Sequence, residues 1–97
     1  MQVISDLLGY QFRLTDERWQ HILKNHPELQ QKKNKISQTL MDPDVIVQSR
    51  LDPQTRIYQQ KYQDKYFFTV VVHLDKKFII TAFITDKIKL GKILWQK

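Results

Sequence analysis

Two histidines, His21 and His26, are the side chains of this chain best suited to acid–base chemistry. They lie in the segment TDERWQHILKNHPE, residues 15–28. The unperturbed pKa of histidine lies near neutrality, so an imidazole can accept or release a proton close to physiological pH. The formal net charge of +6 favours an anionic substrate for such a site.

Polar residues of the C-terminal half provide a second group of candidates. In residues 56–62 a strand with a period of two would carry Arg56, Tyr58 and Tyr62 on one face, which we interpret as a possible open surface, and Lys61 on the other. Thr81 lies in a later strand-like segment. A guanidinium or ammonium group can stabilise phosphate charge, and aromatic rings can stack on bases.

Together these residue types could cleave RNA without a metal ion. A base would activate the 2′-hydroxyl, a cation would stabilise the charge at phosphorus, and an acid would protonate the leaving oxygen. The product would be a 2′,3′-cyclic phosphate, and DNA would be inert because it lacks the 2′-hydroxyl. The proposed catalytic residues are His21, His26, Arg56, Tyr58 and Thr81, with Lys61 and Tyr62 in substrate binding. The remaining histidine, His73, has no partner in the pattern and is left outside the site.

Each candidate also has an ordinary structural explanation. His26 continues the apolar stripe of its predicted helix, whereas His21 points to another side and could be a plain surface residue. Arg56 could prevent unwanted pairing at a strand edge, and Tyr58 could simply bury its ring. Thr81 could be present because threonine favours strands. A non-catalytic RNA- or protein-binding module therefore stays open as the alternative, and a small DNA-binding protein is a third possibility.

Metal and cofactor chemistry have little support in the sequence. The chain has no cysteine, so a disulfide framework and cysteine-ligated zinc are excluded. His21 and His26 would be separated by roughly 140° around an ideal helix, unlike the i,i+4 pair of a helical zinc site. Gly9 and Gly91 are isolated, so no phosphate-cradling glycine loop exists. We expect no metal and no cofactor.

Charge and hydropathy predict the setting of the protein. Sixteen Lys and Arg against ten Asp and Glu favour a polyanionic partner, with RNA the candidate that fits the proposed chemistry. The longest apolar runs, near 67–72 and 78–84, are too short to span a bilayer and are typical of strands. Nothing at the N-terminus resembles a cleavable signal. We therefore expect a cytoplasmic protein without membrane association.

The periodicity predicts a single α+β domain over residues 1–97. Thr15 is a predicted N-cap for a helix that ends near Pro27, and a second helix follows over 28–41. Period-two segments over 45–47, 56–62, 66–74 and 78–85 predict strands with short antiparallel connections, whereas residues 86–97 fit a helix, a strand or a tail equally. We expect two N-terminal helices packed on one face of a roughly four-stranded antiparallel sheet, with the other face available for function.

The order of several short motifs resembles a family of small barnase-like nuclease domains. HILKNHPE, TLMDPDVI, RIYQQKY, FTVVVHL and FIITAFITDKIKLGKILW follow one another over about residues 21–95. The group contains barnase, EndoU, nuclease colicins and RelE, together with phage and toxin–antitoxin members. The resemblance implies two helices on a four-stranded antiparallel sheet, metal-independent ribonuclease activity, and a growth-inhibiting toxin held by an acidic antitoxin protein.

The resemblance also implies roles for particular residues. The histidines of the first motif fall on His21 and His26, and an Arg-x-Tyr element falls on Arg56 and Tyr58. A Thr-Ala-aromatic element begins at Thr81 and ends at Phe83, where tyrosine is common in similar sequences. Phe83 joins the predicted substrate-binding residues on this basis.

Overall fold

The computed structural model describes residues 1–97, which form seven strands, two α-helices and one 3-10 helix. In chain order these are β1 (Gln2–Ser5), β2 (Gln11–Leu14), α1 (Asp16–Asn25), η1 (Pro27–Leu29), α2 (Lys33–Met41), β3 (Val45–Ser49), β4 (Thr55–Lys61), β5 (Phe67–His73), β6 (Phe78–Thr85) and β7 (Gly91–Gln96).

The expected fold of two helices on a four-stranded antiparallel sheet is wrong. The chain forms one seven-stranded mixed sheet in the order β1-β2-β6-β5-β4-β3-β7, with 23% of residues helical and 42% in strands. The four expected strands form its antiparallel centre, β6-β5-β4-β3. The N-terminal hairpin β1-β2 extends this centre through a parallel bridge to β6, and β7 extends it beside β3. The pairings of β2 with β6 and of β7 with β3 join segments distant in sequence, which local periodicity does not reveal.

The helices begin and end largely for the reasons that the sequence indicates. The predicted N-cap is confirmed, because the hydroxyl of Thr15 accepts a hydrogen bond from the Arg18 amide at 3.0 Å. Helix α1 ends before Pro27, which begins η1 instead of a longer helix. The predicted start of the second helix at residue 28 is therefore wrong. Helix α2 begins at Lys33, after Gln31 has adopted a positive φ of 66° that breaks the helical path.

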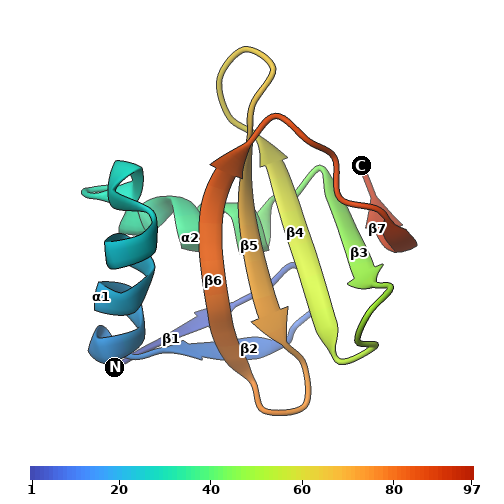
Figure 1. Ribbon diagram of the computed structural model, residues 1–97. Helices are drawn as coiled ribbons and strands as arrows, with labels where there is room; N and C mark the ends of the chain where they lie inside the picture. Colours follow the sequence, from blue (N-terminus) through green and yellow to red (C-terminus); the bar gives the residue numbers. More distant parts are fainter.

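The core lies between the sheet and the elements behind it. Tyr58 pairs with Val70 and Ile46, and Val70 pairs with Ala82; all four are buried and share one sheet face. Helix α2 packs against β4 and β5 on this side, and α1 packs beside β6. Figure 1 shows β1 and β2 running behind the lower part of the sheet.

A buried hydrogen bond fastens the N-terminal hairpin to the sheet. The Asp6 carboxylate, just after β1, accepts a hydrogen bond from the hydroxyl of the fully buried Tyr58 on β4. The same carboxylate accepts hydrogen bonds from the backbone amides of Leu8 at 2.9 Å and Tyr10 at 2.8 Å, and these bonds close the turn of the hairpin. The Phe12 ring packs edge-on to Tyr58 at 6.3 Å. Burial, and then the bond to Asp6, raise the pKa of Tyr58 above its ordinary value.

After β6 the chain crosses the opposite face of the sheet to reach β7. We call residues 86–90 the strap (Figure 1). The buried Gln59 side chain holds the strap: its amide donates to the Lys87 carbonyl at 3.0 Å, and its oxygen accepts the Lys89 amide at 3.0 Å. The same amide donates to Thr69 on β5 at 3.1 Å. Because Gln59 alternates with Tyr58 along β4, the strap lies on the face away from α2.

Replacing Tyr58 by phenylalanine should change the response of stability to alkaline pH. Because the pKa of Tyr58 is raised in the folded protein, the unfolded chain loses this proton first, above about pH 10. The free energy of unfolding then falls with rising pH, by up to about 1.4 kcal/mol per pH unit from this group. In urea denaturation at neutral pH, the free energy of unfolding of Tyr58→Phe should be about 1 to 3 kcal/mol below that of the wild type. Above about pH 10 it should fall less steeply with pH than that of the wild type.

Tyr66→Phe, at an exposed ring, is the matched control and should keep the wild-type alkaline slope. Equal slopes for wild type and Tyr58→Phe would contradict the role of the Tyr58–Asp6 hydrogen bond.

Gly91→Ala should weaken the docking of β7 on β3. A Cβ atom at residue 91 would stand 2.1 Å from the backbone carbonyl oxygen of Gln48, so the two strands would have to separate. We expect a loss of about 1 to 3 kcal/mol in the free energy of unfolding, measured in urea. Lys92→Ala, on the neighbouring exposed residue, should change it by less than about 0.5 kcal/mol. Equal free energies of unfolding for Gly91→Ala and Lys92→Ala would contradict this expectation, because they would show that β7 and β3 can separate at residue 91 without loss of stability.

Candidate nucleic-acid interface

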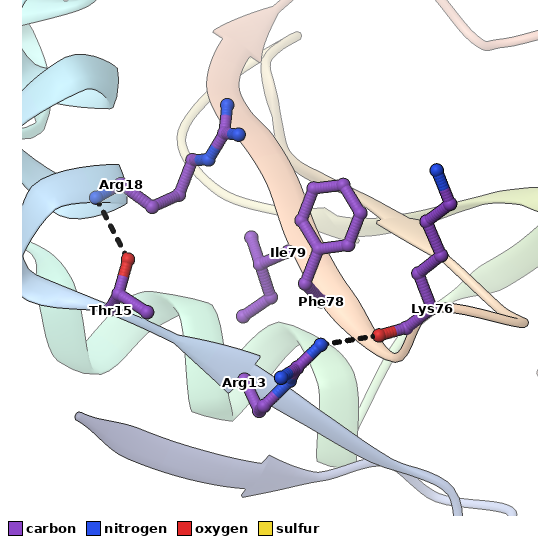
Figure 2. Close-up of a pocket in the computed structure, with 6 residues that line it drawn as sticks. All are labelled: Arg13, Thr15, Arg18, Lys76, Phe78 and Ile79. Carbon is purple, nitrogen blue, oxygen red and sulfur yellow. Dashed lines mark hydrogen bonds between the residues drawn. The ribbon is translucent and has the colours of Figure 1, made fainter.

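The structure contains an open depression of about 520 Å³ at the start of α1. It lies between the end of β2, the first turn of α1 and the turn from β5 to β6 (Figure 2). We call it the basic groove; its lining residues are Arg13, Thr15, Arg18, Lys76, Phe78 and Ile79. Three of these six side chains are cations.

Arg13 and Lys76 are brought together where β2 meets β6. Arg13 forms the parallel bridge to Phe78, and its backbone amide donates to the Lys77 carbonyl at 2.9 Å. Its guanidinium donates to the Lys76 carbonyl at 2.8 Å, as the dashed line in Figure 2 shows. This contact orients the guanidinium at the mouth of the groove while leaving other N–H groups free for an incoming anion.

Arg18 and Phe78 form the opposite wall, and His73 supports Phe78 from outside the lining. The Arg18 guanidinium lies 5.4 Å from the Phe78 ring centre and donates to the Ile80 carbonyl at 3.4 Å. The His73 ring stacks on Phe78 with centroids 5.8 Å apart and planes 9° from parallel. Nδ1 of His73 accepts the Lys76 amide at 3.1 Å, so the neutral ring carries its proton on Nε2. The wall thus combines a cation with the flat ring of Phe78.

A second depression, of about 320 Å³, continues from the basic groove along α1. Thr15 and Arg18 line both depressions, and Glu17 and His21 complete the second. His21 is exposed, and its Nε2 lies 3.3 Å from the side-chain nitrogen of Asn25. The structure therefore places a titratable imidazole next to the arginine that borders the basic groove.

The basic groove carries uncompensated positive charge. None of Arg13, Arg18 and Lys76 takes part in any of the four ion pairs of the protein. Arginine side chains bind phosphate oxygens through paired N–H groups, and aromatic rings accept stacked bases without strong sequence preference. The groove is therefore suited to a phosphate-bearing ligand with flat rings, such as a single-stranded nucleic acid.

The structure does not bring all of the sequence-predicted site residues together. Tyr58 is fully buried on the face that packs against α2 and the N-terminal hairpin. On the same side the Arg56 guanidinium lies over the Tyr10 ring at 4.8 Å, and Tyr62 packs against Phe68. The interpretation of this face as an open surface is wrong, because the period of a strand shows which residues share a face but not which face is covered.

The other predicted residues lie elsewhere. Thr81, Phe83 and Lys61 are on the face away from α2. Phe83 meets His26, with ring centroids 5.7 Å apart, and His26 at the end of α1 also pairs with Glu28 at 3.6 Å. Among the predicted residues, only His21 lines either of the two joined depressions.

Sequence reasoning missed most of the basic groove. Arg13 and Arg18 flank the Thr15 cap, so their position at a helix start was the available signal. Lys76 lies in the turn that precedes Phe78, and the pairing of His73 with Phe78 follows from that turn. The parallel bridge from β2 to β6 joins the two parts, and no local pattern predicts it.

No family model, curated protein or solved structure matches the chain. No helix is long and apolar enough to cross a membrane. Histidine and acidic side chains nowhere gather in a group of three that could hold a metal ion. The function is therefore inferred from the residues of the two depressions themselves.

Arg18→Gln should weaken the binding of a single-stranded RNA oligonucleotide. Removing one phosphate contact should lower affinity at low salt by about tenfold and reduce the slope of log K against log salt by about 0.7. Fluorescence anisotropy over a salt series measures both quantities. Lys24→Gln removes the same charge from an exposed position of α1 that lines neither depression, and it should change the affinity much less. Equal losses in the two variants would show that only net charge matters.

Proposed function

We propose that the protein is a metal-independent endoribonuclease that binds RNA in the basic groove. The observation that carries the proposal is the continuity of the groove, with its three unpaired cations and the Phe78 ring, into the depression that holds His21. Phosphate binding, base stacking and proton transfer are thus available along one surface.

The residues of the two depressions divide the chemistry among them. His21 takes the proton of the 2′-hydroxyl as that oxygen attacks phosphorus and the bond to the 5′-oxygen breaks, and a solvent water gives the departing 5′-oxygen its proton. In the reverse assignment water takes the first proton and His21 gives the second. Arg18, next to it, stabilises the charge that builds on the phosphate oxygens. Arg13 and Lys76 hold neighbouring phosphates, and the Phe78 ring offers a flat surface to a base. Arg56 and Tyr58 have no direct role in this proposal.

The resemblance to barnase-like nucleases adds a biological role to the proposal. In that role the protein is a growth-inhibiting toxin that acts on cytoplasmic RNA and is held by an acidic antitoxin. Expression from an inducible promoter tests it: growth should stop with the wild type and continue with His21→Ala.

A non-catalytic RNA-binding module is the second candidate. It is favoured by the observation that His21 is the only histidine lining either depression, so a complete acid–base pair is not evident there. Such a module would use the same cations and rings and would bind RNA without cleaving it.

Cleavage of an RNA oligonucleotide in EDTA separates the two candidates. If His21 transfers a proton, His21→Ala should slow cleavage by at least about a hundredfold while leaving RNA affinity nearly unchanged. The products should carry 2′,3′-cyclic phosphate ends, and the DNA oligonucleotide of the same sequence should stay intact. Gel electrophoresis and mass spectrometry provide the measurements.

His26→Ala is the matched control, because His26 packs against Phe83 outside the two depressions. It should retain most of the activity, with any loss of stability followed by thermal unfolding. RNA that is bound but uncut at every pH would exclude the nuclease and support the non-catalytic binding module. RNA that is neither bound nor cut would overturn both candidates.

A further inference from the structure

An apolar hollow lies beneath the strap, and it shares no residue with the basic groove. Its volume is about 320 Å³, and its walls come from β3, the ends of β4 and β5, the strap and β7. Six of its twelve lining residues are hydrophobic. We call it the strap hollow.

Large aliphatic side chains surround the strap hollow without being covered. Ile88 is 63% exposed, Leu90 is 68% exposed and Ile93 is 55% exposed. Single exposed apolar residues are normal on a protein surface, but three that line one hollow form a patch of the kind that binds another molecule.

The rim of the strap hollow is positively charged. Arg50, Lys61 and Lys89 line it, and Asp44 is the only acidic lining residue. The Asp44 carboxylate is already occupied, because it accepts the Lys61 backbone amide at 2.6 Å and lies 3.8 Å from the Lys97 ammonium group. Neither Arg50 nor the Lys61 side chain has an acidic partner in the protein.

We propose that the strap hollow binds an acidic polypeptide segment that carries aliphatic side chains. The aliphatic residues would enter the hollow and the carboxylates would meet Arg50 and Lys61 at its rim. A second copy of this chain fits poorly, since two rims of the same positive charge would repel. Nucleic acid fits poorly too, because Phe67 is the only aromatic residue of the lining. The proposal goes beyond RNA cleavage and does not depend on it.

Binding of two synthetic peptides tests the charge requirement. One peptide alternates glutamate with leucine, and the other replaces every glutamate by lysine. Fluorescence anisotropy should show saturable binding of the glutamate peptide alone, weakened by salt. The double variant Arg50→Glu and Lys61→Glu should reverse this preference, and both side chains are exposed, so the exchange leaves the core intact. Lys24→Glu with Lys32→Glu is the matched control and should keep the wild-type preference.

Ile93→Glu tests the apolar contact. It should lower the affinity for the glutamate peptide by about tenfold or more, as expected for a side chain that the bound peptide buries, while the affinity for single-stranded RNA stays unchanged. A circular dichroism spectrum of Ile93→Glu that matches that of the wild type would show that the variant is folded.

Three results would overturn the proposal. The first is equal binding of the two peptides, or no binding of either one. The second is loss of RNA binding in Ile93→Glu, which would assign the hollow to nucleic acid. The third is a wild-type dimer that Ile93→Glu converts to a monomer, which would assign it to a second copy.

Discussion

The hydrogen bond between Tyr58 and Asp6 is the contact on which the rest of the architecture depends. It joins residues 52 positions apart, and it holds a hairpin of two four-residue strands that would be marginally stable alone. A buried hydrogen bond to a charged group stabilises by about 1.5 to 3 kcal/mol. By fixing the hairpin beneath β4, it also fixes β2 beside β6, and this junction forms the basic groove. A core contact thus determines the geometry of a surface site.

The sequence predicts the centre of the fold better than its margins. The strand over 78–85 is confirmed to the residue, because a continuous run of β-branched and aromatic residues between polar turns has few alternatives. Thr15 likewise identifies the start of α1 through its own side chain. Strand β1 escapes prediction because its four residues show no clear period, and β7 because its pairing depends on a distant partner. Gly91, for example, has to lie close to Gln48 for β7 to dock, and nothing in the local pattern of either residue indicates this.

The candidate site divides in the same way. Periodicity correctly separates His21 from His26 by direction, and the structure places one beside the basic groove and the other against Phe83. For Arg56 and Tyr58, periodicity correctly predicts that the two residues share a sheet face, but it does not reveal that this face is covered. Residue type alone suggested chemistry for Tyr58, whereas Asp6 supplies a structural use for the same hydroxyl. Arg13 and Lys76 become neighbours only through the contact between β2 and β6.

The contacts of the strap lead us to expect an order in the folding of the chain. The Gln59 side chain binds residues 87 and 89 of the strap and Thr69 on the neighbouring strand, so its full set of bonds exists only when β4 is paired with β5. Strand β7 pairs with β3, and β4, β5, β6 and the strap lie between the two in the chain, so the entropic cost of bringing them together is lower once the central strands have paired. We therefore expect β7 to dock late in folding. Because β7 is an edge strand, we also expect the strap and β7 to open more readily than the centre of the sheet.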